Sequence, residues 1–323
     1  MIKKVIVFGG FGFIGLKLAT KLCELGFKVD LVDITYDKKL LNDIKRTYKK
    51  NIKFKKLDVT DIKFFKKIKT NDYYYIFDCA AFLGVDKIIN NSYESLRNNI
   101  LSSLNISLFA KKQINLQKII FMSSSEVYDG SLIKYINKPP NKEESNLVIS
   151  ELNHPRTVYM FSKIAGELFN INSKLPYLNL RLHNVFGPRM CGEHAIPSFI
   201  KKFSKNKKDI EIFNKNHVRS YIYIDEAIDQ IIQISLNKKS NLSTFNIGSD
   251  KNVFKNFQLA LQIKKLMKAK NKIVYKHNKK NSVKYRKPSL IKLRKIIKKN
   301  YKSNFLNQMK NTIDYFSIKW KKN

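Results

Sequence analysis

The sequence predicts an α/β fold in which a parallel sheet is covered by helices on both faces. Two observations predict it. Short, almost continuously apolar segments alternate with helical segments through the first half of the chain, and a glycine-rich turn joins the first such pair. Strands buried on both faces read as unbroken apolar runs, because neither face meets water. The 323 residues, 43% of them hydrophobic, suffice for one large domain or two smaller ones.

The expected elements of the first half follow in a regular order. We expect strands at residues 3–9, 27–33, 52–59, 72–81, 117–125 and 177–185. We expect helices at 13–26, at about 92–112 and at about 155–173. Helices that fall between strands in this way provide the crossovers that parallel strands need.

After about residue 187 the segments become shorter. Strand patterns occur at 210–213, 219–224 and 243–248, and helical patterns at 225–236, 254–268, 289–299 and 305–316. We therefore interpret residues 1–187 as one domain, to which segments at about 218–250 return, and residues 188–323 as a smaller C-terminal α/β region.

The net charge of +38 raises the question of nucleic-acid binding. Only eight of the 63 basic residues are arginine, the residue whose planar fork suits phosphates and bases. The lysines are spread along the chain among many asparagines and isoleucines, as a composition bias would produce. We expect a solvated lysine-rich surface and no nucleic-acid partner; attraction of anions, or a basic nucleic-acid binder, is the alternative.

Other composition features concern the compartment and possible cross-links. The sequence contains no run of 18 apolar residues, so we expect no membrane-spanning segment. The N-terminus reads directly as a strand, without a secretory signal pattern, so we expect a cytoplasmic protein. Cys23, Cys79 and Cys191 lie far apart and form no CxxC or Cys/His cluster, which argues against disulfides and a zinc site.

The first strand runs into Gly9, Gly12 and Gly15 at the start of a helix. In a dinucleotide site the first glycine makes the tight turn, the second lets a pyrophosphate approach the backbone, and the third lets the helix pack on the strand. Asp33 ends the second strand, where a carboxylate binds the adenosine ribose and repels a 2′-phosphate. These residues predict NAD rather than NADP; the alternative is a glycine-rich turn that binds nothing.

Tyr159 and Lys163 lie four residues apart in a predicted helix, and therefore on one face. An ammonium beside a phenol favours the phenolate, so the tyrosine can take a proton well below its free pKa of about 10. Three serines, residues 123–125, end the fifth strand, at the edge where open parallel sheets bind ligands. A serine hydroxyl there can hold an oxygen while the tyrosine removes its proton. The alternatives are an ordinary surface pair and a polar strand end.

Together these motifs resemble the NAD-dependent epimerase/dehydratase family, an extended branch of the short-chain dehydrogenases/reductases that acts on nucleotide sugars. The resemblance covers nearly the whole chain, in the segments GGFGFIG (9–15), LDVTD (57–61), DCAAFLGV (78–85), NNILSS (98–103), SSSEVY (123–128), YMFSK (159–163), RLHNVFGPR (181–189), RSYIYIDEAI (219–228), FNIGS (245–249) and YRKPS (285–289). It implies a Rossmann-type doubly wound parallel sheet with a smaller C-terminal α/β substrate-binding cap, and a homodimer formed through the helices near Asn99 and Tyr159.

The resemblance also implies the site residues. For NAD they are Gly9, Gly12, Phe13, Ile14, Gly15, Asp33, Asp58, Val59, Ala80, Ala81, Asn99, Tyr159 and Lys163. For the nucleotide sugar they are Ser124, Ser125, Asn184, Arg219 and Arg286, and the catalytic residues are Ser124, Tyr159, Lys163 and Glu126, with no metal. The chain departs from the family pattern at Leu16, at Cys79 and at Asp129, which precedes Gly130. Four of the eight arginines fall inside these motifs, where we expect them to grip phosphate or carboxylate: Arg181, Arg189, Arg219 and Arg286.

The family chemistry implies that Tyr159 takes the proton of a sugar 4-hydroxyl held by Ser124, while hydride passes to NAD and leaves a 4-ketone. The next step decides the reaction. A dehydratase carries Asp-Glu where this chain has Ser125-Glu126, so its acid is missing. We favour an epimerase, with a UDP-glucuronate decarboxylase-like lyase as the alternative and a non-catalytic NAD-binding scaffold as a remote one.

Overall fold

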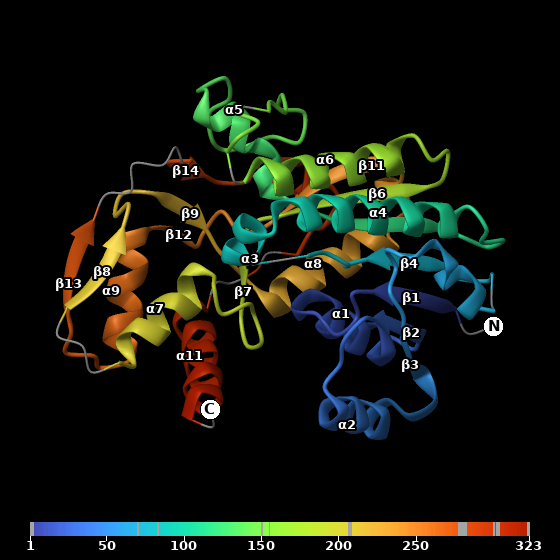
Figure 1. Cartoon of the computed structure of the whole chain (residues 1–323), viewed down its shortest axis with the longest axis horizontal. Coiled ribbons are helices and arrows are strands. Elements are labelled where there is room, and N and C mark those ends of the chain that lie inside the picture. The colour runs from blue at the N-terminus through green and yellow to red at the C-terminus, as the bar shows by residue number, and fades with distance from the viewer. Residues whose placement is uncertain are drawn as a thin grey trace.

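A seven-stranded parallel sheet forms the centre of the protein (Figure 1). The computed structural model describes residues 3–69, 71–82, 84–149, 151–154, 156–205, 209–276, 283–299, 301 and 304–321. In the order β11-β6-β5-β4-β1-β2-β3, every neighbouring pair is parallel. The strands are β1 (Lys4–Phe8), β2 (Lys28–Asp33), β3 (Ile52–Lys56), β4 (Tyr75–Asp78), β5 (Lys118–Ser124), β6 (Tyr177–Leu182) and β11 (Ser243–Ile247). The predicted fold class is confirmed.

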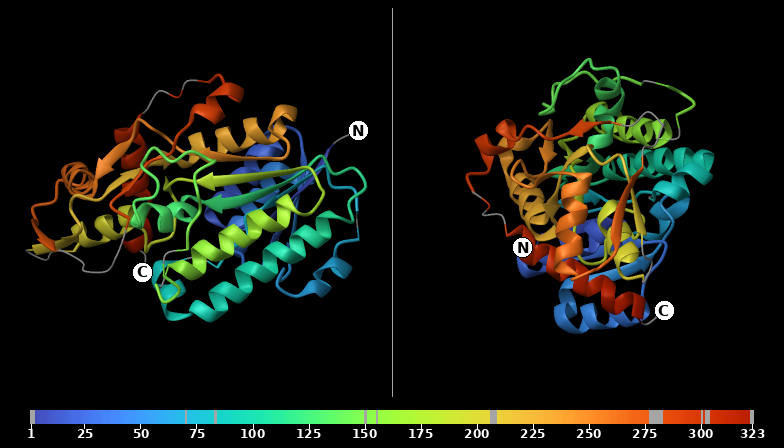
Figure 2. Two further views of the ribbon diagram at one scale, coloured as in Figure 1. Left: turned by 90° about the horizontal axis from the view of Figure 1, so that it is seen from above. Right: turned by 90° about the vertical axis from the view of Figure 1, so that its left-hand side faces the viewer.

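Helices cover both faces of this sheet because its strands direct apolar side chains to both faces. In β1, Val5 and Val7 belong to the same core cluster as Leu18 of α1 (Phe13–Glu24). Ile6 and Phe8 belong to a second cluster on the opposite face, with Phe109 of α4 (Ser92–Ala110). On the first face α1 packs against α8 (Ile224–Leu236), and on the second α4 runs beside α6 (Thr157–Ile171) (Figure 2). The remaining helices of this part are α2 (Lys38–Tyr48), which the sequence analysis does not predict, α3 (Val85–Asn90) and α5 (Asp129–Ile133).

Smaller sheets and helices form the cap at the carboxyl end of the large sheet. The predicted strand at 219–224 divides at Tyr221, because β9 (Val218–Ser220) pairs with β12 and β14 whereas β10 (Ile222–Tyr223) pairs with β7. The other elements are β7 (Val185–Phe186), α7 (Ala195–Phe203), β8 (Asp209–Phe213), β12 (Val253–Lys255), α9 (Asn256–Leu266), β13 (Lys272–Lys276), β14 (Tyr285–Arg286), α10 (Ile291–Ile296) and α11 (Phe305–Lys321). The domain division at residue 187 stays a prediction.

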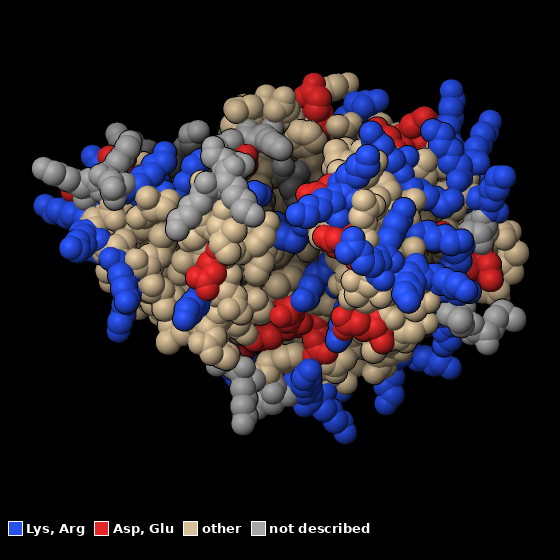
Figure 3. Space-filling model, turned by 90° about the horizontal axis from the view of Figure 1, so that it is seen from below, with Lys and Arg blue, Asp and Glu red and all other residues tan. Residues whose placement is uncertain are grey.

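Basic side chains are spread widely over the surface. Figure 3 shows lysines and arginines over much of one face, most densely in its right half, with acidic side chains in several smaller groups, the largest in the lower middle. Within the described ranges, none of the helices is long and apolar enough to cross a membrane.

Candidate functional site

Close backbone contacts shape the turn between β1 and α1. Gly9 has φ +67°, and a Cβ at this position would lie 2.5 Å from the carbonyl oxygen of Cys79. A Cβ at Gly15 would lie 2.2 Å from the carbonyl oxygen of Gly9. Gly12, the N-cap of α1, makes no side-chain cap, and among described atoms a Cβ there would meet only the Gly9 oxygen, at 3.1 Å. The first N–H groups of α1 therefore face open space, where an anion can bind.

A cavity of about 610 Å³ lies in front of this turn, at the carboxyl edge of the sheet. Ten of the residues predicted for the cofactor line it: Gly9, Gly12, Phe13, Ile14, Gly15, Asp33, Asp58, Val59, Ala80 and Ala81. Sequence reasoning did not predict Phe11, Thr35, Thr60, Arg97, Asn98, Ser102, Cys191 or His194, which also line it. The volume lies within the range of cofactor pockets. The glycine turn, the open helix end and Asp33 therefore fit a dinucleotide.

Backbone hydrogen bonds fix the rim of the cavity. Asp33 accepts from the N–H of Phe11 through Oδ2 (2.9 Å) and from the N–H of Thr35 through Oδ1 (3.1 Å). Asn99 does not line the cavity; its Oδ1 accepts from the N–H of Phe82 at 2.6 Å. It therefore holds the segment that follows β4, rather than lining the space where a cofactor would lie.

Ser124, Tyr159 and Lys163 converge where β5 ends against α6. The Ser124 side chain interacts with the Tyr159 phenol and lowers its pKa. The Nζ of Lys163 donates to the carbonyl oxygen of Met122 (2.8 Å) and lies 5.8 Å from the centre of the Tyr159 ring. Tyr159 and Lys163 are buried, 8% and 5% exposed. The predicted catalytic groups thus form one cluster.

Burial dominates the electrostatics of this cluster. Burial raises the pKa of Tyr159 and Glu126 raises it further, while Arg156 and the interaction with Ser124 lower it. Burial also lowers the pKa of Lys163, which a nearby carboxylate, Asp78, opposes. The expectation that Lys163 lowers the pKa of the phenol stays a prediction. Arg156 is a second cation that lowers this pKa, and burial outweighs it.

Two carboxylate–arginine pairs flank the cluster. Glu126 binds Arg156 through both oxygens, with Nε to Oε2 at 3.1 Å and Nη2 to Oε1. Asp129 accepts from Nη2 of Arg286 through both oxygens, at 2.5 and 2.6 Å. Sequence reasoning assigned no role to Arg156 or Asp129. The available signals were the position of Arg156 three residues before Tyr159 and the departure from the family pattern at Asp129.

The remaining predicted substrate residues lie around these pairs. Ser125 is buried, and Asn184, with φ +33°, donates from Nδ2 to the carbonyl oxygen of Ser220 at 2.8 Å. Arg219 donates to the carbonyl oxygens of Val218 (2.8 Å) and Val283 (2.7 Å). Burial, reinforced by the charge of Arg286, lowers the pKa of Arg219 to about 10.

Residues 5–248 match the family model described as "NAD dependent epimerase/dehydratase family". The chain belongs to this family. The prediction made from its motifs is confirmed, and with it a NAD-dependent enzyme family that modifies nucleotide sugars by epimerisation, dehydration or decarboxylation.

Individual proteins resemble most or nearly all of the chain. A UDP-N-acetyl-alpha-D-glucosaminuronate decarboxylase of Bacillus cytotoxicus is 28% identical over 98% of both chains. A dTDP-D-glucose 4,6-dehydratase of Dictyostelium discoideum is 29% identical over 77% of this chain and 59% of its own length. A solved structure of a UDP-N-acetylglucosamine 4-epimerase from Methanobrevibacter ruminantium M1, in complex with UDP-N-acetylmuramic acid, has TM-score 0.82, 27% identity and 98% and 99% coverage. These relatives catalyse three different reactions.

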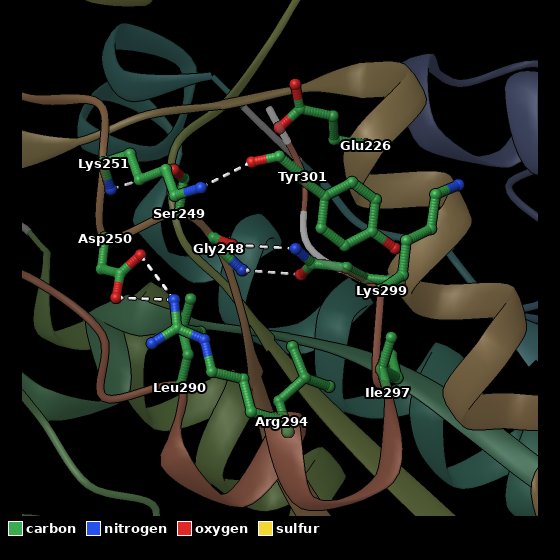
Figure 4. A pocket seen from close by; sticks show the side chains of 12 residues that line it. Glu226, Gly248, Ser249, Asp250, Lys251, Leu290, Arg294, Ile297, Lys299 and Tyr301 are labelled. Atoms are coloured by element: carbon green, nitrogen blue, oxygen red, sulfur yellow. Dashed lines mark hydrogen bonds and ion pairs between the residues drawn. The ribbon is translucent and has the colours of Figure 1, made fainter. Parts of the chain in front are cut away.

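This epimerase/dehydratase-family chain has a second hollow, between α8, α10 and the segment after β11 (Figure 4). Its volume is about 40 Å³, which leaves room for a few water molecules. Its polar groups bind one another: Gln230 bonds both backbone groups of Gly248 (3.0 and 3.2 Å), and Arg294 donates to both oxygens of Asp250 (2.7 Å each). The polar groups around this hollow are thus occupied with one another, unlike those at the cavity of the glycine turn.

Proposed function

We propose that the chain is a NAD-dependent nucleotide-sugar 4-epimerase, which oxidises a sugar at C4 and returns the hydride to the opposite face. One observation carries this proposal: Ser124, Tyr159 and Lys163 form one cluster, and Lys163 interacts electrostatically with Cys79, which lines the glycine-turn cavity, while Glu126 is held in an ion pair. Epimerisation needs the first three groups and no separate acid or base.

The chain's own residues have separate tasks in this reaction. Ser124 holds the 4-oxygen by a hydrogen bond, and Tyr159 takes the proton of that hydroxyl and later returns it. Lys163, fixed by Met122, places a cation near the phenol. NAD, which the glycine turn and Asp33 would hold, supplies the hydride acceptor when bound. Burial raises the pKa of the Tyr159 phenol, so the phenol acts as a base only if nearby positive charge, from Lys163 or from NAD when bound, lowers that pKa.

The state of Glu126 argues against dehydration. Burial alone would raise its pKa, but Arg156 and Arg286 outweigh burial and hold the pKa below its ordinary value. An ionised carboxylate fixed by two hydrogen bonds is a poor proton donor. The preceding residue is Ser125 rather than an acid, so no second carboxylic acid replaces it at that position.

A decarboxylase acting on a nucleotide-linked uronic acid is the second candidate. Arg156 and Arg286 next to Glu126 supply cations for a sugar carboxylate, which leaves readily as carbon dioxide once C4 is a ketone. The 28% identity with a decarboxylase over 98% of both chains also favours it.

The proposal includes a homodimer formed through α4 and α6, which lie side by side at the surface. Their outer faces expose large apolar side chains, including Tyr93, Phe161 and Leu168. Burial of these side chains against a second copy would remove them from water. Sedimentation of the purified protein measures this directly, and a monomer at micromolar concentration would contradict it.

The test of the reaction is incubation with NAD and a panel of UDP- and dTDP-linked hexoses and hexuronates, with products identified by mass and NMR. An isomer of unchanged mass supports the epimerase. Loss of carbon dioxide would show a decarboxylase instead, and loss of water a dehydratase. Glu126→Gln separates the candidates further. We expect this substitution to lower turnover modestly in an epimerase. Turnover should fall by about 10²-fold or more if Glu126 transfers protons after decarboxylation. A variant that forms NADH but stalls before product would favour the decarboxylase.

A further inference from the structure

Two buried arginines lie side by side at the edge of the candidate substrate site. In the parallel pairing of β14 with β9, Arg286 is the direct register partner of Arg219. Arg286 is 7% exposed, and burial together with the neighbouring charge of Arg286 lowers the pKa of Arg219. Two like charges in a low-dielectric environment repel each other unless anions lie between them.

Among the described residues, one carboxylate is hydrogen-bonded to these two arginines. Asp129, the first residue of α5, binds Arg286 through Nη2 alone, whereas Arg219 donates to two backbone carbonyls. The Nε of Arg286 is buried and has no hydrogen-bond partner in the described part of the chain. A buried donor without a partner costs free energy, and its presence here points to a missing acceptor.

The nearby charges leave this region one positive charge in excess. Asp129 interacts electrostatically with Arg286, Arg219 and Arg156, and with one further carboxylate, Glu126. Glu126 is already bound by both nitrogens of Arg156. The ligand that completes the site is therefore anionic and reaches Arg219 and the free side of Arg286.

We propose that Asp129 is an affinity-determining residue that occupies part of the anion site formed by Arg219 and Arg286, and that it releases Arg286 when the diphosphate of a substrate binds. The inference rests on the proposed function in taking the anion to be the diphosphate of a nucleotide sugar. A glycine or another neutral residue in place of Asp129 would leave Arg219 and Arg286 without a bound carboxylate. The Asp129 carboxylate, which holds Arg286 before substrate binds, therefore lowers the affinity of the protein for substrate.

This competition depends on pH. Burial raises the pKa of Asp129 to about 6; Arg286, Arg219 and Arg156 oppose this rise, and Glu126 adds to it. Below that pH the protonated carboxyl no longer holds Arg286 as an ion pair, so a diphosphate binds more tightly. Above it the ionised carboxylate competes. Affinity for a diphosphate should therefore rise as the pH falls from 7.5 to 5.5.

Calorimetric titration of the NAD-saturated protein tests the proposal, with UDP-glucose and dTDP-glucose as probes. Their diphosphate diesters carry no proton that titrates in this pH range, so pH effects report groups on the protein. We expect Asp129→Asn to bind a probe about tenfold more tightly than the wild type at pH 7.5, and to lose the wild-type gain on acidification. A variant that binds no more tightly, or a flat wild-type profile, overturns the proposal.

Control variants separate this effect from loss of folding and from general charge effects. Asp250→Asn removes a carboxylate that binds Arg294 in the same two-oxygen manner away from the cavity (Figure 4), and should leave binding unchanged. Asp129→Asn combined with Arg286→Met should abolish the gain in affinity for the probe that Asp129→Asn alone produces. If Asp129→Asn does not fold, the wild-type pH profile decides alone. If no probe binds to any of these proteins, the proposed function fails as well; binding without a role for Asp129 overturns this inference only.

Discussion

Two buried arginine–carboxylate pairs in this protein look alike in composition and differ in how completely their hydrogen bonds are used. Arg181 donates to both oxygens of Glu167 (2.9 and 2.7 Å), and its Nη1 reaches the Tyr128 hydroxyl and the Glu143 carbonyl, both at 2.9 Å. Arg286 meets Asp129 through Nη2 only, and its Nε lacks a partner among the described residues.

The difference shows which arginine belongs to the core and which to a site. Both lie in family motifs, and both are at most 7% exposed, so residue type and burial do not separate them. A complete set of hydrogen bonds joins β6 to α6 and leaves nothing for a ligand. An incomplete set keeps donors available, at a cost in stability. Removing a group from the core pair should therefore cost stability, whereas removing a group from the site should change binding or turnover.

The largest functional effect expected on the site side comes from Tyr159→Phe. Loss of the phenolic oxygen should lower turnover by roughly 10²- to 10⁴-fold, the range for a lost acid or base. Stability should change by only about 1 kcal/mol, since the phenolic oxygen loses only its interaction with Ser124. Turnover on the substrate found in the panel and urea unfolding measure the two effects. Wild-type turnover would show that another residue takes the proton.

On the core side, Glu167→Gln breaks the complete pair. It leaves Arg181 buried without its countercharge, which should reduce the free energy of unfolding by about 3–5 kcal/mol. The Ser123 hydroxyl, which donates to Glu167 at 2.5 Å, keeps an acceptor in glutamine. Urea unfolding of this variant next to Asp129→Asn gives a direct comparison. Equal losses in both would remove the distinction between core and site.

Arg156→Met sharpens the comparison inside the site. Arg156 lies 5.9 Å from the centre of the Tyr159 ring and lowers the pKa of that phenol. Without Arg156 the pH profile of turnover should move to higher pH. A rise of one unit in the pKa of the phenol should lower turnover at neutral pH by about tenfold. Arg156→Lys should restore part of the profile, whereas Arg294→Met is a control far from the phenol. An unmoved profile would make Arg156 a structural partner of Glu126 alone.

The cofactor side of the site was predictable from the sequence because its determinants are local. A strand, a tight turn and a helix lie within residues 4–24, and Asp33 follows directly at the end of the next strand. The arginine pairs were not predictable in this way. Asp129 and Arg286 lie 157 positions apart, and Glu126 and Arg156 lie 30 apart. The family resemblance assigns only Arg286 to the substrate, but residue type and spacing alone do not distinguish it from Arg181, because the difference is the number of acceptors that the fold brings to each.

A smaller effect is expected at Asp33, whose carboxylate already binds two backbone N–H groups but lines the cavity. Asp33→Ala removes the negative charge that repels a 2′-phosphate. The preference for NAD over NADP should narrow by about tenfold, a change of about 1.4 kcal/mol. Titrations with both cofactors measure it, and Asp61→Ala, a nearby carboxylate that does not line the cavity, is the matched control. Equal affinities in the wild type would contradict the NAD assignment.

The last test asks whether the Asp129–Arg286 pair stabilises the fold at all. Burial raises the pKa of Asp129 from 3.8 to about 6, so between these values the folded protein holds a proton that the unfolded chain has lost. Stability contributed by this proton is present below about pH 4 and is lost as the pH rises through 6. The free energy of unfolding of the wild type, minus that of Asp129→Asn, should therefore fall by about 1–3 kcal/mol over this interval and then level off. Urea unfolding of both proteins from pH 4 to 8 measures the difference. A rise over the same interval would mean that the ionised pair stabilises the fold as the Arg181–Glu167 pair does, and the contrast between them would disappear.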